Sequence, residues 1–104
     1  MLKMRLLIVS LMLNSGLALA EVSASRQIEL THLLKQDCGS CHGMTLKGGL
    51  GPALLPEQLD GKSTDYLVMT ILEGHPNTAM PGWKTMLSTD DALWIANQIK
   101  QGLD

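Results

Sequence analysis

The chain has 104 residues, with eight lysines and arginines against ten aspartates and glutamates, and a formal net charge of −2 at pH 7. It has no basic run and no basic patch interleaved with aromatic residues, which argues against a nucleic acid as its partner. With no phenylalanine, one tyrosine and two tryptophans, the chain has few large apolar side chains for its core. We therefore expect a disulfide, a metal or a bound cofactor to complete the fold.

The first twenty residues, MLKMRLLIVSLMLNSGLALA, have the three-part pattern of a secretory signal peptide. Lys3 and Arg5 make a basic start, an apolar run follows, and Ala18-Leu19-Ala20 is a small-x-small cleavage site. The apolar run is shorter than the roughly 20 residues that cross a bilayer. We predict a signal peptide over residues 1–20, a single periplasmic domain over residues 21–104, and no stable membrane insertion after cleavage.

Three helices are predicted in the mature chain. Leucines recur at helical spacing from Ser25 to Asp37. The run from Ser63 to Glu73 begins with a capping-type Ser or Thr and ends before a glycine. From residue 88 to Gly102, a capping-box pattern precedes an apolar stripe at helical spacing. The glycine-rich segment over residues 43–61 is too long for a mere connector, so we expect it to follow a cofactor.

Both cysteines lie in CGSCHG, residues 38–43, with a histidine directly after the second one. A structural zinc site needs four ligands, and the rest of the chain offers only two more histidines. A thioredoxin-like redox pair belongs to a strand-rich context that this chain lacks. Cys-x-x-Cys-His in a secreted chain is instead a strong signal for covalent haem c. We predict one haem c, bound through thioethers from Cys38 and Cys41, with His42 as the proximal iron ligand.

The sixth iron ligand has several candidates. Met80 is favoured because it lies in NTAMPGW, a loop between two helical segments whose Pro-Gly pair stiffens and turns the backbone. His75, five residues upstream, is the main competitor, and Met86 is a weaker one because it lies just before a helix cap. Met44 lies too near the attachment site, and Met69 lies in an apolar helical segment where core packing is expected.

The order CGSCHG, Gly51-Pro52, AMPGW and a C-terminal helix resembles a class I cytochrome c over essentially the whole mature chain. The stretches GGLGPAL and MPGW are similar to the small NirC-type cytochromes c of denitrifying bacteria, which accompany the nitrite reductase that contains haem c and haem d. The resemblance implies an all-α fold of three to four helices wrapped around one covalently attached haem. It also implies that the Pro52 carbonyl accepts a hydrogen bond from His42 Nδ1 and orients the imidazole.

The two tryptophans complete the set of candidate residues. Trp83, directly after the ligand loop, is expected to contact the haem, either through a hydrogen bond to a propionate or by packing on the porphyrin edge. Trp94 lies off the apolar stripe of the C-terminal helix, and Gln98 stands where the family usually carries an aromatic residue. We expect Trp94 to fold down beside Trp83 or the Met80 loop, with partial exposure as a partner anchor as the alternative.

These ligands predict the function. With His42 and Met80 both on the iron, no coordination position remains open for a substrate, so the site passes one electron without activating oxygen, peroxide or nitrite. We predict an electron carrier and not an enzyme. Gas sensing at an iron that Met80 has vacated, and a weak peroxidase assisted by His75, are the alternatives from other classes.

The resemblance also implies the partners. They are redox proteins of the nitrite reductase system: either the reductase itself, which would receive electrons, or the factors that mature its special haem. Lys47 and Lys84 are the positive charges that we expect near the exposed haem edge, where a partner would dock.

Overall fold

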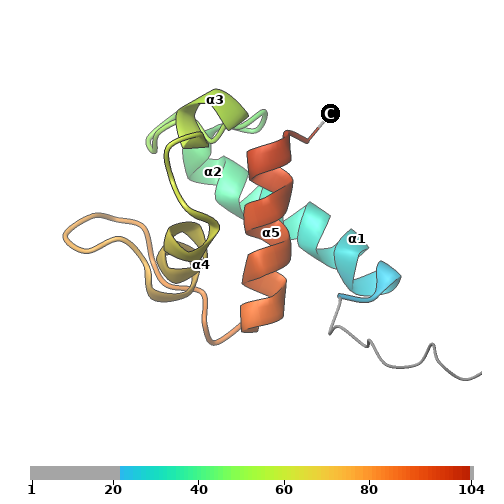
Figure 1. The fold of residues 1–104 in the computed structure, drawn as a ribbon. Coiled ribbons are helices and arrows are strands. Elements are labelled where there is room, and N and C mark those ends of the chain that lie inside the picture. The colour runs from blue at the N-terminus through green and yellow to red at the C-terminus, as the bar shows by residue number, and fades with distance from the viewer. Residues whose placement is uncertain (1–21, 104) are drawn as a thin grey trace, which may run out of the picture.

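The computed structural model describes residues 22–103, and all the regular elements in this range are helical. In chain order they are α1 (Ala24–Leu33), the π-helical turn η1 (Leu34–Cys38), α2 (Gly39–His42), α3 (Pro56–Leu59), α4 (Thr64–Glu73) and α5 (Thr89–Gln101), as Figure 1 shows. The predicted all-α fold class is confirmed. The predicted signal peptide lies outside the described residues. None of the described helices is long and apolar enough to cross a membrane.

The first three elements form one continuous rod that ends at His42 (Figure 1). The Ser23 hydroxyl accepts a hydrogen bond from the Arg26 N–H and caps the start of α1. In η1 the Gly39 N–H donates to the Leu34 carbonyl, five residues back, as in a π-helix. The predicted helix over Ser25 to Asp37 was therefore too short at its C-terminal end. Helical structure continues through the Cys-x-x-Cys-His motif even though apolar periodicity ends before it.

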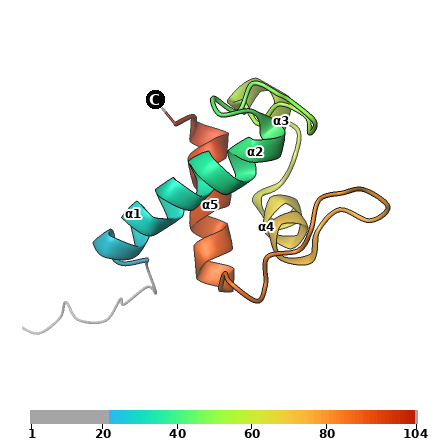
Figure 2. The same cartoon turned by 180° about the vertical axis from the view of Figure 1, so that it is seen from behind.

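Helix α5 crosses the rod near its middle (Figures 1 and 2). Its capping box is present: the Ser88 hydroxyl accepts from the Asp91 N–H and the Asp91 carboxylate accepts from the Ser88 N–H, both at 3.0 Å. The predicted apolar stripe is buried, and the helix ends at Gly102 as expected. The stripe consists of Ala92, Ile95, Ala96 and Ile99.

Helix α4 packs against α5 and carries the predicted caps, Ser63 at its start and Gly74 at its end. Leu67 is its one buried residue. Met69 is 58% exposed, so the expectation that it packs in the core was wrong. The reason is geometric, because two residues along an α-helix turn the side chain about 200° away from the buried face.

The buried core contains aliphatic side chains from all the long helices and from the loop after α2. Leu30, Leu34 and Ile95 are its largest fully buried side chains, and all three belong to one packed cluster. Both tryptophans pack only at the edge of this cluster, where they are partly buried. The packing of the rod against α5 therefore supports the two long loops.

Candidate functional site

The Cys-x-x-Cys-His motif lies on the last turns of the rod. Cys38 is half-buried, Cys41 is exposed, and both are free thiols. Burial raises the pKa of the Cys38 thiol to about 11, with smaller contributions from Asp37 and Cys41. At neutral pH Cys38 is therefore a protonated thiol. The two sulfurs come from one short stretch of helix, with the imidazole next in sequence.

The imidazole of His42 is held by the loop after α2. Its Nδ1 lies 2.7 Å from the carbonyl oxygen of Pro52. A carbonyl only accepts, so Nδ1 carries the proton and the lone pair of Nε2 is left for a metal. This is the hydrogen bond that the class I resemblance implied for these two residues.

Backbone contacts fold the same loop directly onto α2. The Gly48 N–H donates to the His42 carbonyl at 2.8 Å, and the Gly51 N–H donates to the Cys41 carbonyl at 2.7 Å. Helical carbonyls at a C-terminus have no partner within the helix, so these bonds cap α2. A Cβ on Gly51 would lie 2.9 Å from both Cε1 and Nδ1 of His42. We therefore add Gly51 to the residues that set the ring position; its place before Pro52 was the only sequence signal for it.

Met80 lies in the loop over residues 74–88, which joins α4 to α5, and is half-buried. His75 is exposed, and its N–H donates to the Met80 carbonyl, five residues further along the chain, at 3.4 Å. This loop and the loop after α2 lie on the same side of α5, away from the N-terminal end of α1, in both views (Figures 1 and 2). The fold thus brings the Met80 segment and the loop that holds the His42 ring to one side of the molecule. Trp83 is half-buried at the end of the Met80 segment.

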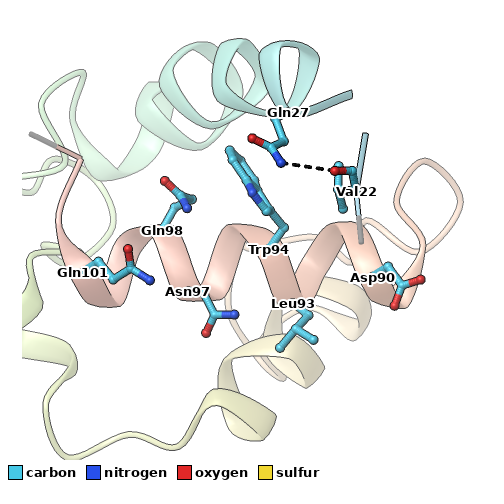
Figure 3. Close-up of a pocket in the computed structure, with 8 residues that line it drawn as sticks. All are labelled: Val22, Gln27, Asp90, Leu93, Trp94, Asn97, Gln98 and Gln101. Carbon is cyan, nitrogen blue, oxygen red and sulfur yellow. Dashed lines mark hydrogen bonds between the residues drawn. The ribbon is translucent and has the colours of Figure 1, made fainter. Parts of the chain in front are cut away.

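Trp94 lies elsewhere. Its indole extends from α5 toward α1 into a hollow of about 320 Å³ that Val22 and Gln27 also line, with Gln27 Nε2 donating to the Val22 carbonyl (Figure 3). The expectation that Trp94 folds beside Trp83 or the Met80 loop was therefore wrong. Helix α4 packs on one face of α5, and α1 crosses α5 on another face. A side chain such as Trp94, which points away from α4, therefore lies beside α1. Gln98 lines the same hollow.

The donor set fits haem c. Two free thiols, an imidazole with an available Nε2 and a thioether-bearing loop on the same side of α5 are the groups that such a haem takes from a protein. Of the two lysines expected near a docking partner, Lys47 is exposed, whereas Lys84 lies 3.0 Å from Glu73 Oε1. Pairing neutralises part of the Lys84 charge, so Lys84 presents less positive charge to a partner than the sequence indicated.

Comparison with known proteins defines the class. Residues 27–98 match the family described as cytochrome C oxidase, cbb3-type, subunit III. The chain therefore belongs to this family of c-type cytochromes, whose members are haem proteins of electron transfer.

The particular relatives are small cytochromes. The chain is 55% identical over 87 residues to cytochrome c55X of Pseudomonas aeruginosa. The matched residues make up 84% of this chain and 73% of that protein. The solved structure of the c-type cytochrome NirC is similar with a TM-score of 0.75 and 56% identity, and the match covers 76% of this chain and 93% of that one. The resemblance to NirC-type cytochromes is confirmed.

A part of a larger protein is also similar. Dihydro-heme d1 dehydrogenase of Pseudomonas aeruginosa is 38% identical over 77 residues, which is 74% of this chain and 15% of that protein. The solved structure of dihydro-heme d1 dehydrogenase NirN in complex with DHE matches with a TM-score of 0.58 and 35% identity, over 65% of this chain and 15% of that one. A cytochrome unit of this kind therefore also occurs within a much longer chain.

Proposed function

We propose that the chain binds one haem c through thioethers from Cys38 and Cys41, with His42 as proximal ligand and Met80 as the sixth ligand. The observation that carries the proposal is the 2.7 Å contact between His42 Nδ1 and the Pro52 carbonyl, on the same helical turns as two free thiols. A bound haem would supply a one-electron redox centre.

The residues of the chain give that centre its character. The Pro52 carbonyl fixes the tautomer and orientation of His42 and makes its Nε2 a stronger donor. As a second ligand, Met80 would raise the reduction potential relative to a second imidazole. Because His42 and Met80 would both bind the iron, a bound haem would leave no ligand position for a substrate, which favours electron transfer over catalysis. Trp83, at the end of the Met80 segment, packs against the haem or binds a propionate.

We propose that these electrons serve the nitrite reductase system in the periplasm. Support comes from the similarity to the c-type cytochrome NirC and to cytochrome c55X. The leader predicted over residues 1–20 would direct the chain there.

A second candidate role is that of a redox partner in the maturation of the special haem of nitrite reductase. Its support is the match to one part of dihydro-heme d1 dehydrogenase. A separate chain of the same kind is suited to accept electrons from that dehydrogenase. Two reactions separate the roles: the reduced cytochrome is mixed with nitrite reductase, and the oxidised cytochrome is mixed with the dehydrogenase and its substrate. The reaction in which the haem absorption of the cytochrome changes faster identifies its role.

The axial ligands are tested first. The chain is expressed with haem-attachment machinery, and the near-infrared sulfur-to-iron charge-transfer band of the ferric protein is recorded for wild type, Met80→Ala and His75→Ala. We expect the band in wild type and His75→Ala and its absence in Met80→Ala. Failure to attach haem would refute the whole proposal. Attached haem without the band in wild type would favour His75 or an open iron, and with it gas sensing or catalysis.

A further inference from the structure

The backbone of the Met80 segment lies against the C-terminal end of α4 with almost no space between them. A Cβ on Gly82 would lie 2.5 Å from the Leu72 carbonyl oxygen. A Cβ on Gly74 would lie 2.8 Å from the Met80 carbonyl oxygen and 2.9 Å from the Gly82 nitrogen. Real Cβ atoms do not approach this closely, so a side chain at either position forces the backbone apart. We call these two residues and the backbone they bring together the glycine seam.

Hydrogen bonds join the two sides of the seam. The Trp83 N–H donates to the Ile71 carbonyl at 2.9 Å, and the Lys84 N–H donates to the Leu72 carbonyl at 3.2 Å. Both carbonyls belong to the last turn of α4, where helical carbonyls lack a partner within the helix. The segment that follows Met80 thus caps α4, and the cap depends on the close approach that Gly82 allows.

The seam also closes the loop that contains Met80. The chain leaves α4 at Gly74, which has φ +85°, and returns to the end of the same helix at Gly82. Between these two points the His75 N–H meets the Met80 carbonyl at 3.4 Å. The backbone of Met80 is therefore fixed relative to α4 by groups of the chain itself.

We propose that Gly74 and Gly82 are positioning residues for Met80: the seam holds the thioether at the iron and limits its replacement by an external ligand. This inference rests on the proposed assignment of Met80 as sixth ligand. When Met80 leaves the iron and its segment lifts from α4, the bonds from Trp83 and Lys84 to the helix break with it. A side chain in the seam makes this opening easier, because the close contact is relieved in the open form.

The test is imidazole competition on the holoprotein. Gly82→Ala is compared with wild type and with Gly61→Ala, a control at a glycine whose added Cβ would meet nothing within 4 Å. Loss of the near-infrared charge-transfer band is followed as imidazole is added. We expect the Gly82→Ala midpoint to fall about tenfold, which corresponds to about 1.4 kcal/mol. The Gly61→Ala midpoint should stay at the wild-type value. In Gly74→Ala the new side chain would be too close to its neighbours and the backbone φ would be unfavourable, so we expect the imidazole midpoint to fall at least as far.

A second measurement uses the wild-type protein, so it does not depend on a variant that folds. Hydrogen exchange of the Trp83 and Lys84 amides is recorded with and without saturating imidazole. We expect both amides to be protected in the native protein and to lose that protection when imidazole replaces Met80, while the Ala92 amide of α5 keeps its own.

The outcomes separate the two proposals. A wild-type protein without the band would refute Met80 ligation and the seam's role with it. A wild-type protein with the band, an unshifted Gly82→Ala midpoint and unchanged Trp83 protection would refute only the seam's role. Loss of the band in Gly82→Ala that merely follows loss of the far-UV helical signal would show that the seam acts only on folding, which also contradicts the inference.

Discussion

The crossing of the rod with α5 and the two long loops, one that holds the His42 ring and one that contains Met80, are held together in different ways. At the crossing, side chains make the contacts: buried aliphatic residues and an ion pair between Arg26 and Asp91. In the loops, backbone groups make them, with glycines at the closest approaches and carbonyls of α2 and α4 as acceptors. Substitutions at the crossing should therefore change the stability of the whole domain, whereas substitutions in the loops should first change the positions of the proposed ligands His42 and Met80.

The largest expected effect breaks the crossing. Leu30 is fully buried, and Leu30→Ala is expected to lower the free energy of unfolding by about 2–5 kcal/mol, from lost transfer free energy and the cavity left behind. Chemical denaturation followed by far-UV circular dichroism measures it. The control is Ile28→Ala on the same helix, 73% exposed and expected to change stability by about 0.5 kcal/mol or less. Equal effects in the two variants would contradict the packing of the rod against α5.

The next effect belongs to the loops. In Gly51→Ala the new methyl group would stand 2.9 Å from the His42 ring, so we expect a strain of about 1–3 kcal/mol and a displaced imidazole. The readouts are the reduction potential and the yield of covalently bound haem. Both should fall in Gly51→Ala and stay unchanged in Gly61→Ala. A variant with unchanged potential and yield would show that the loop yields without moving the ring.

The ion pair at the crossing predicts a pH dependence. Asp91 is buried, and its carboxylate accepts from Arg26 Nη2 at 2.8 Å and from the Ser88 N–H. The hydrogen bond from Arg26 is the main cause that lowers the pKa of Asp91. A lowered folded-state pKa stabilises the fold above the unfolded value of about 3.9, and this stabilisation is lost as the pH falls through the folded-state pKa.

Asp91→Asn tests this dependence. We expect the variant to lose about 1–2 kcal/mol at neutral pH, because the charged hydrogen bond is gone and the helix cap is weakened. As the pH falls from about 4 through the lowered folded-state pKa of Asp91, the stability of the variant should converge with that of wild type, because Asp91 itself becomes neutral over this range. Asp90→Asn, an exposed neighbour in the same helical turn, is the control and should keep the wild-type pH profile. Urea denaturation at a series of pH values gives both curves, and parallel curves for Asp91→Asn and wild type would contradict the assignment.

The accuracy of the sequence predictions also differs between the helix crossing and the loops. Side-chain patterns predicted the α4 and α5 helices well, because caps and apolar spacing are local signals that the structure retains. The prediction of the hydrogen bond between His42 and Pro52 came from family resemblance and not from any local pattern. The position of Trp94 was mispredicted because it depends on which side of α5 the rod crosses, and single-helix periodicity carries no information about that.

The loop contacts were the least predictable part. Glycine-rich spacing predicted a long loop over residues 43–61, but it predicted neither the short helix α3 within that range nor the position of Gly51 against the imidazole. Gly82 was read as a turn residue, whereas the structure places it against the α4 carbonyls. Such contacts depend on where two backbones meet in space, and a glycine signals only that a side chain is missing there.

The smallest expected effect separates backbone from side chain within the loops. Lys84 contributes to the seam through its N–H, while its ammonium group pairs with Glu73 at the surface. Lys84→Ala keeps the N–H and removes the exposed ion pair, so we expect at most about 1 kcal/mol of lost stability, and less at high salt. The imidazole midpoint should stay at the wild-type value. A midpoint that falls as far as in Gly82→Ala would show that the side chain, and not the backbone bond, holds the Met80 segment on α4. The exposed Lys47→Ala is the control for charge alone. Within residues 22–103 no acidic side chain pairs with Lys47, so its loss should slow electron transfer to an acidic partner more than the loss of Lys84 does.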